Sequence, residues 1–272
     1  METMAQGELI FLKLGGSLIT DKRQAHTARL ETLARLAGET AAALQAQPGL
    51  RLVLGHGSGS FGHVPARRYG TRQGVRTADD WRGFVEVGRE AAALNRLVMD
   101  ALAEAGAPVV AFPPSACVSA ADGQVRAWNL APLQAALSHG LAPVVFGDVV
   151  FDEQRGGTIL STEDLFTHLA AVLRPQRVLL AGIEPGVWAD FPDCTRLVET
   201  ITPGTLAQAA GGLHGSAATD VTGGMASKVE LSLRLAAAVP GLEVRIFSGE
   251  QPGVLQRALA GEPAGTLITA AP

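Results

Sequence analysis

Short runs of apolar residues alternate with longer amphipathic stretches along most of the chain. The runs have the length of β-strands and are apolar on both sides, as is typical of strands that helices cover on both faces. They occupy residues 9–14, 50–54, 108–112, 142–146, 177–181, 242–247 and 266–269. The amphipathic stretches predict helices over residues 28–45, 78–105, 130–138, 162–173, 224–238 and 254–259. This alternation predicts an α/β fold, a three-layer αβα sandwich with a central, mainly parallel sheet.

Shorter segments with strand character interrupt the alternation in the middle of the chain. Residues 149–151 and 158–160 flank a polar turn and predict a β-hairpin, and residues 123–128 predict a short strand near it. No linker or compositional break divides the chain. The sequence therefore predicts a single domain over residues 1–272, in which an N-terminal half to about residue 170 packs closely against the C-terminal half.

The composition narrows the class of protein. The 272 residues carry a formal net charge of −4, which argues against a nucleic-acid-binding surface. No apolar stretch approaches the roughly 20 residues that a membrane span needs, and the N-terminus does not have the pattern of a secretory signal. Cys117 and Cys194 lie far apart without a metal-ligand pattern, which predicts reduced thiols. We expect a cytoplasmic protein with no nucleic-acid, membrane or structural-metal partner.

Four glycine-containing segments with charged residues follow predicted strands, and ligands of open parallel sheets bind at the carboxyl ends of the strands. The first segment contains Lys13, Gly15, Gly16 and Ser17, with Lys22 after it. The glycines let the backbone approach a phosphate and direct N–H groups at it. A lysine inside an apolar strand also needs a partner. A strand-to-helix turn with solvated lysines would account for the glycine pair alone, but the lysine favours a phosphate contact.

The second segment is a glycine-rich loop that ends in His63. The loop matches G-x-G-x-x-G, so a dinucleotide site has to be considered. However, it follows the second strand rather than the first, and the next residues include Pro65 and suit a long helix poorly. An anion-binding loop explains the segment better, with Gly57, Ser58 and Gly59 around a phosphate and His63 as a hydrogen-bond donor.

The third segment surrounds the hairpin. Gly147 and Asp148 precede it, and Glu163 and Asp164 follow it at the start of a predicted helix. Thr162 suits the N-cap of that helix, and acidic residues in the first turn suit the helix dipole. That explanation is sufficient by itself. The functional alternative is that Asp164 orients lysines at a phosphate site.

The fourth segment, residues 219–228, contains Asp220, Gly223, Gly224 and Lys228 and opens a predicted helix. A cation near a helix N-terminus destabilises the helix by some tenths of a kcal/mol unless a polyanion binds there. The segment therefore predicts a phosphate contact. The chain contains neither a G-x-x-x-x-G-K-[ST] motif nor the protein-kinase motifs, which excludes those two classes of nucleotide site.

Together, the four segments resemble the amino acid kinase superfamily and, within it, the isopentenyl phosphate kinase family, over essentially the whole chain. Lys-x-Gly-Gly-Ser near the start and Thr-Asp-x-Thr-Gly-Gly-x-x-x-Lys near the end mark the superfamily. Ile-Thr-Asp-Lys, which ends at Lys22, and Ser-Phe-Gly-His, which ends at His63, mark the narrower family. The resemblance implies a homodimeric kinase that uses ATP with Mg²⁺ and phosphorylates isopentenyl phosphate to isopentenyl diphosphate.

The resemblance also implies roles for individual residues. Those in catalysis are Lys13, His63, Asp164 and Lys228, with the two lysines beside the transferred phosphoryl group and Asp164 holding the lysines. Those at ATP are Lys13, Gly15, Gly16, Ser17, Lys22, Gly186, Asp220, Gly223, Gly224 and Lys228. Those at the acceptor are Gly57, Ser58, Gly59, His63, Gly147, Asp148 and Phe84. The N-terminal half would bind the acceptor and the C-terminal half the nucleotide.

The sequence departs from the family pattern at two places. Residues 181–186 replace the common Thr-Asp before Val-Asp-Gly, which leaves the adenine and ribose contacts undefined. Ser58 replaces the middle glycine of His-Gly-Gly-Gly, and its N–H and hydroxyl can both still donate to a phosphate. The helix over residues 78–105 carries Phe84 and other apolar residues that could wall a pocket for a prenyl tail, although most of that stripe suits core packing.

Three alternatives remain open from the sequence. A fosfomycin-type phosphonate kinase shares the histidine-bearing loop. A regulatory or storage protein could bind a nucleotide on the same fold without catalysis, although Lys13, Asp164 and Lys228 argue against it. A dinucleotide-dependent oxidoreductase is the third alternative.

Overall fold

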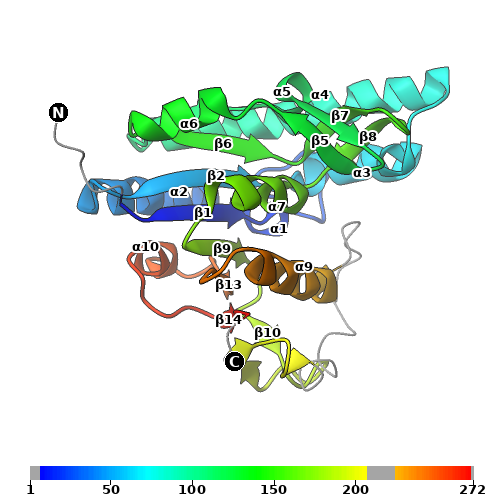
Figure 1. The fold of residues 1–272 in the computed structure, drawn as a ribbon. Helices are drawn as coiled ribbons and strands as arrows, with labels where there is room; N and C mark the ends of the chain where they lie inside the picture. The colour runs from blue at the N-terminus through cyan, green and yellow to red at the C-terminus, as the bar shows by residue number, and fades with distance from the viewer. Residues whose placement is uncertain (1–6, 207–223, 271–272) are drawn as a thin grey trace.

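The computed structural model describes residues 7–206 and 224–270, which form one large sheet, smaller sheets and covering helices (Figure 1). The large sheet has eight strands in the order β12-β14-β13-β9-β1-β2-β6-β3. These strands are β1 (Leu9–Leu14), β2 (Arg51–His56), β3 (Val109–Ala111), β6 (Ala142–Phe146), β9 (Arg177–Gly182), β12 (Thr200–Ile201), β13 (Glu243–Ser248) and β14 (Thr266–Ile268). Its pairs are parallel except for β13 with β14. The predicted mainly parallel sheet is confirmed.

Helices cover both faces of this sheet, because successive strand residues point to opposite sides. Phe11 packs into the apolar cluster under α6 (Ala131–Ser138), α7 (Thr162–Leu173) and α9 (Gly224–Ala238). Leu12, one residue on, packs into the cluster under α2 (Leu30–Ala46), α4 (Ala78–Glu104) and α10 (Val254–Leu259). Both residues are fully buried. The αβα sandwich follows from these two apolar layers.

A four-stranded sheet in the order β5-β4-β7-β8 lies beside the sandwich (Figure 1). Its strands are β4 (Val118–Ala121), β5 (Gln124–Trp128), β7 (Asp148–Asp152) and β8 (Gly156–Leu160), and β7 and β8 form the predicted hairpin. Val149 of β7 packs against Phe84 and Val87 of α4. This small apolar cluster fixes the hairpin over the end of the large sheet. A separate pair joins β10 (Val187–Trp188) to β11 (Leu197–Val198).

The glycine-rich loop leads directly into a helix that the sequence argument did not include. Helix α3 spans Gly59–Tyr69 and contains Pro65. A proline inside a helix removes one hydrogen bond and costs about 3 kcal/mol. The helix nevertheless forms because it packs against α4 and buries both Phe61 and Pro65. Tertiary packing outweighs local propensity here, so a helix that the sequence analysis did not predict follows the loop.

Short helices fill the remaining connections. They are α1 (Gly16–Ile19), α5 (Pro114–Cys117) and the 3₁₀ turn η1 (Thr71–Gln73). Within the described residues, no helix is both long and apolar enough to cross a membrane.

Candidate active site

The carboxyl ends of β1, β2, β6 and β9 open into one cavity of about 240 Å³. The N-terminal turns of α7 and α9 close it from the side. Most of the predicted site residues line this cavity, namely Lys13, Gly15, Gly16, Ser17, Lys22, Gly57, Ser58, Gly59, His63, Gly147 and Lys228. Segments from opposite ends of the sequence therefore meet at the edge of the sheet where ligands were expected.

Two glycine segments touch at the centre of the cavity. A Cβ atom on Gly16 would lie 2.5 Å from the backbone N of Gly59, so only glycine permits this approach. Gly59 itself has φ +49°, and a Cβ atom there would lie 2.1 Å from Thr20 Oγ1. Because the backbones approach so closely, both segments line the same cavity, and glycine backbone at a cavity wall suits bound phosphates.

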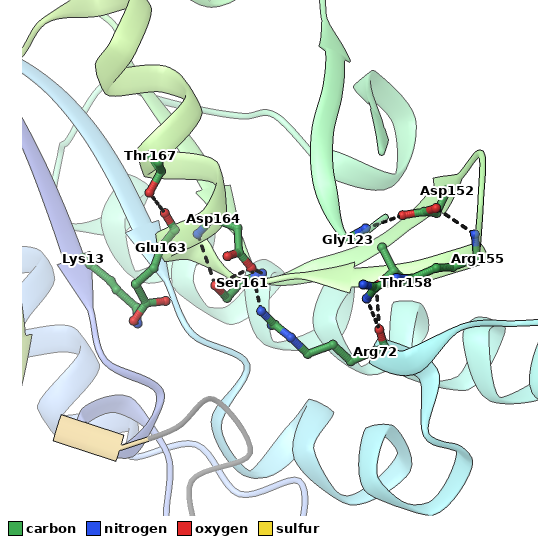
Figure 2. A network of polar contacts seen from close by, with 10 residues as sticks. All are labelled: Lys13, Arg72, Gly123, Asp152, Arg155, Thr158, Ser161, Glu163, Asp164 and Thr167. Carbon is green, nitrogen blue, oxygen red and sulfur yellow. Dashed lines mark hydrogen bonds and ion pairs between the residues drawn. The ribbon is translucent and has the colours of Figure 1, made fainter. Parts of the chain in front are cut away.

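Lys13 forms an ion pair with Glu163, the second residue of α7 (Figure 2). Lys13 lies in β1 between Gly55 of β2 and Leu180 of β9, so its position in the large sheet is central. The Lys13 and Glu163 side chains are only 11% and 13% exposed. Burial alone would raise the pKa of Glu163, but the neighbouring Lys13 ammonium holds that pKa below its usual value. Glu163 therefore stays a carboxylate at neutral pH.

Asp164 does not contact Lys13, which corrects the expectation for this residue. Its carboxylate accepts hydrogen bonds from the backbone N and the Oγ of Ser161, both at 2.8 Å, and from Arg72 Nη2 at 3.0 Å (Figure 2). Ser161, rather than Thr162, is the N-cap of α7, and Asp164 completes a capping box with it. In S-x-x-D the aspartate turns back to the cap. This signal in the sequence could have identified Glu163 as the carboxylate that faces the cavity.

The cavity carries an excess of positive charge. Its cationic side chains are Lys13, Lys22, Arg67, Arg72 and Lys228, and its carboxylates are Glu163 and Glu184. His63 and Arg67 lie four residues apart on α3 and so share one face of that helix. An excess of cations with helix N-termini and glycine N–H groups suits two polyanions bound side by side.

One end of the cavity is apolar. Ala66 of α3, Val87 of α4 and Ile159 of β8 line it. Val87 belongs to the cluster that fixes the hairpin, and Ala66 and Ile159 pack against that cluster. The glycine loop and the apolar end are thus joined by α3, which carries His63 on one turn and Ala66 on the next. A ligand with an anionic head and a short apolar tail fits this arrangement.

Two predicted acceptor residues lie away from the cavity wall. Asp148 is buried, and its carboxylate accepts hydrogen bonds from the backbone N of Ser115 at 3.1 Å and of Val149 at 2.8 Å. Burial raises its pKa, against the lowering effect of these hydrogen bonds. Phe84 packs with Trp81 and Phe151, at ring-centroid distances of 5.2 and 5.3 Å. Asp148 therefore holds α5, the short helix before β4, in place through Ser115. Phe84 packs in the same apolar cluster as Val87.

The predicted nucleotide residues divide into three groups. Lys228 lies on α9 and lines the cavity, whereas Gly224, the first residue of that helix, is buried outside its wall. Gly186 packs against β14, where a Cβ atom would lie 2.6 Å from Thr266 Oγ1, so its glycine serves the fold. Asp220 and Gly223 lie outside the described residues.

Many residues that line the cavity had no site role predicted from the sequence. They are Ala66, Arg67, Gly70, Arg72, Gln73, Val87, Ile159, Ser161, Thr162, Glu163, Leu180, Met225 and Ile246. Gly62 also lines the cavity and belongs to the predicted glycine-rich loop, and Ala181, Gly182, Ile183 and Glu184 belong to the segment in which the resemblance implies nucleotide contacts. Three of these cavity residues, Gly62, Ala66 and Arg67, lie on α3, a helix that the sequence analysis did not predict. With that helix in place, the i, i+3 and i+4 positions after His63 are Ala66 and Arg67.

Comparison with known proteins identifies the family to which a chain with this site belongs. The family model described as the amino acid kinase family matches residues 8–248. The chain belongs to the amino acid kinase family. The resemblance to the isopentenyl phosphate kinases is also confirmed. The isopentenyl phosphate kinase of Methanothermobacter thermautotrophicus is 36% identical over 273 residues, which cover 96% of this chain and 99% of that protein.

Further relatives of this member of the amino acid kinase family agree with that assignment. The isopentenyl phosphate kinase of Haloferax volcanii is 38% identical, over 96% of this chain and 98% of that protein. The one of Arabidopsis thaliana is 31% identical, over 78% of this chain and 68% of that protein. A solved structure described as isopentenyl phosphate kinase is 32% identical and superposes with a TM-score of 0.80, over 96% of this chain and all of that one.

Proposed function

We propose that this protein transfers the γ-phosphoryl group of ATP to the phosphate of isopentenyl phosphate and forms isopentenyl diphosphate. ATP as the donor follows from membership of this kinase family, and the curated relatives named above are isopentenyl phosphate kinases. The observation that carries the proposal is the joining of a histidine-bearing glycine loop to an apolar end within one cavity.

The two polyanions would meet at Lys13. The glycine loop with His63 suits the acceptor phosphate, because its backbone N–H groups and the imidazole can both donate to phosphate oxygens. Gly15, Gly16 and Ser17 on one side and Lys228 on the other suit the donor phosphates. Residues before about 170 would thus supply the contacts to the acceptor and, through Gly15, Gly16 and Ser17, part of those to the nucleotide, and Lys228 would add a contact from the C-terminal half.

The reaction needs alignment and charge neutralisation rather than a general base. A phosphate monoester has a second pKa of about 6, so at neutral pH it already carries a nucleophilic oxygen. That oxygen forms a bond to the γ-phosphorus, the bond between the γ-phosphorus and the β,γ-bridging oxygen breaks, and ADP leaves. Lys13, lying between donor and acceptor segments, would neutralise charge on the phosphoryl group in transit, and Glu163 would hold its ammonium in place.

Mg²⁺ would enter with ATP. This ion prefers several waters and phosphate oxygens with one or two carboxylates. The carboxylates that line the cavity are Glu163 and Glu184, and Glu163 is already paired with Lys13. Glu184 is therefore the cavity side chain that suits an ion carried on the nucleotide. The ion would supply further neutralisation of the β- and γ-phosphates.

Parallel kinetic assays test the proposal. ATP consumption is measured with isopentenyl phosphate, dimethylallyl phosphate, fosfomycin, acetylglutamate and UMP as acceptors. We expect the highest kcat/KM with isopentenyl phosphate. A higher kcat/KM with fosfomycin would replace the proposed acceptor by a phosphonate, and ATP binding without turnover of any acceptor would contradict the assignment as a kinase.

The apolar end gives a second prediction. Ala66→Leu places a larger side chain where the prenyl tail would lie and is expected to lower kcat/KM for isopentenyl phosphate about tenfold, because displacing two buried CH₂ groups costs about 1.6 kcal/mol. The value for methyl phosphate, which has no such tail, is expected to change little. Val64→Leu on the same helix is the matched control, since Val64 is 56% exposed. Equal losses for both acceptors would place the tail elsewhere.

A further inference from the structure

A buried histidine lies directly behind the glycine loop. His56 is the last residue of β2 and is 1% exposed, and it is not among the residues that line the cavity. Its ring stacks on Phe146 of β6, with centroids 5.3 Å apart and planes 7° from parallel. Nδ1 lies 3.2 Å from the carbonyl oxygen of Gly57, and Nε2 lies 3.1 Å from Oδ1 of Asn95 on α4.

The hydrogen-bond partners define the tautomer of His56. Burial lowers its pKa, so the ring is neutral at pH 7 and has one N–H group. The carbonyl of Gly57 can only accept, which assigns this N–H to Nδ1. Nε2 is then an acceptor, and the Asn95 amide, whose oxygen and nitrogen exchange places on rotation, satisfies it with Nδ2 turned toward the ring in place of Oδ1. Asn95 is itself buried and so serves to hold the ring.

This hydrogen bond orients the first peptide of the loop. The described cis peptide bond is Phe191–Pro192, so the peptide between Gly57 and Ser58 is trans, and its C=O and N–H groups point in opposite directions. With the carbonyl turned back to His56, the N–H of Ser58 points away from it, on the side where Gly57 and Ser58 line the cavity. Within residues 7–206 and 224–270, no protein acceptor contacts that N–H.

The backbone of His56 ties down the neighbouring segments as well. Its carbonyl oxygen accepts hydrogen bonds from Thr162 Oγ1 at 2.6 Å and from the backbone N of Gly147 at 3.2 Å. Both donors line the cavity. The side chain and the carbonyl of one residue thus connect the glycine loop, the end of β6 and the first turn of α7.

We infer that His56 is a positioning residue for the acceptor phosphate: its Nδ1–H holds the carbonyl of Gly57 away from the cavity and thereby directs the N–H of Ser58 at the phosphate. Without this hydrogen bond the peptide could rotate and present a carbonyl oxygen to an anion, which is repulsive. The inference rests on the proposed function, since that function places the acceptor phosphate at this loop.

Three substitutions of His56 distinguish the roles of its two ring nitrogens. Asparagine places an amide N–H near the position of Nδ1, glutamine places one near Nε2, and leucine removes both. We expect His56→Gln and His56→Leu to raise the KM for isopentenyl phosphate about tenfold, as loss of a buried hydrogen bond commonly does, with the KM for ATP within about twofold of wild type. His56→Asn is expected to keep the KM for isopentenyl phosphate within about twofold.

A stability control separates positioning from a structural role alone. Leu54→Ala opens a cavity in the same strand and is expected to lower the Tm without changing the KM for the acceptor. Equal KM values in His56→Asn and His56→Gln would overturn the inference, whatever their Tm. Binding of inorganic phosphate, measured by calorimetry on the same variants, tests His56 independently of turnover. If the wild type binds phosphate but does not phosphorylate isopentenyl phosphate, the proposed function fails. In that case the phosphate affinities of the three His56 variants, compared with wild type, still test the role of His56.

Discussion

Replacing Lys13 by methionine is expected to reduce kcat by about a thousandfold, because the transferred phosphoryl group loses the cation that lies between the donor and acceptor segments. The same change leaves Glu163 buried without its main partner, which typically costs about 3–5 kcal/mol of the free energy of unfolding. Steady-state kinetics measure the first effect and thermal unfolding the second. Wild-type turnover in this variant would remove Lys13 from the mechanism.

The pH dependence of stability is expected to reverse in Lys13→Met. In the wild type the pKa of Glu163 is lowered, so its contribution to stability is present above its unfolded-state pKa and is lost as the pH falls through the lowered value. Without Lys13, burial, which is the largest effect on this group, is expected to outweigh the backbone hydrogen bond and the attraction of Lys228 and to raise the pKa of Glu163. The native state then binds a proton that the unfolded state releases, so stability falls as the pH rises. The Tm of the variant and of the wild type, compared from below the unfolded-state pKa of Glu163 up to pH 8, measures this reversal.

A double variant separates folding from chemistry. Lys13→Met combined with Glu163→Gln removes the charge that the single change leaves uncompensated, so most of the lost stability is expected to return. Turnover is expected to stay at the level of the single variant. Recovery of turnover together with stability would mean that Lys13 serves only the fold.

His63→Ala is expected to lower kcat/KM for isopentenyl phosphate by about a hundredfold or more, while the affinity for ATP changes little. His63 lies on α3 beside the glycine loop, whereas the segments suited to the donor phosphates follow β1 and open α9. Kinetics with each substrate varied in turn and calorimetry with ATP measure the two effects.

The matched control for His63 is His139→Ala. His139 is an exposed histidine at the C-cap of α6 and does not line the cavity, so its loss is expected to leave the kinetics unchanged. Unchanged turnover in His63→Ala would show that the glycine loop binds its phosphate through the backbone alone.

The apolar periodicity of the sequence predicts the strands of the large sheet and most of the helices that cover it. The predicted ranges 9–14 and 142–146 coincide with β1 and β6, and 162–173, 224–238 and 254–259 coincide with α7, α9 and α10. These elements are buried along a whole face, so their pattern is strong. Helix α3 was not predicted, because its local sequence is glycine-rich and contains Pro65. It is stabilised by tertiary packing, mainly against α4.

The sequence predicted the parts of the site that depend on glycine backbone. It was less informative where two neighbouring side chains of the same type could each face the cavity. Glycines at the strand ends identified the segments around Gly16 and Gly59, because only glycine permits so close an approach of two backbones. The choice between Glu163 and Asp164 depended on which residue caps α7, and an N-cap at Thr162 in place of Ser161 reversed it. Phe84 and Val87 lie one turn apart on α4, and only the position of the hairpin decides which of them faces the cavity.

The order of strands in the large sheet also affects how the acceptor specificity of such an enzyme can change in evolution. On one side β1 adjoins β2, with β6 beyond it, and on the other it adjoins β9, with β13 beyond it. The cavity residues near the apolar end come from α3, α4 and β8, all on the side of β2 and β6 or in the small sheet. Mutations there can alter which acceptor is accepted without disturbing β9, β13 and α9. A gene encoding this fold can therefore acquire a new acceptor in small steps while its use of ATP stays under unchanged selection.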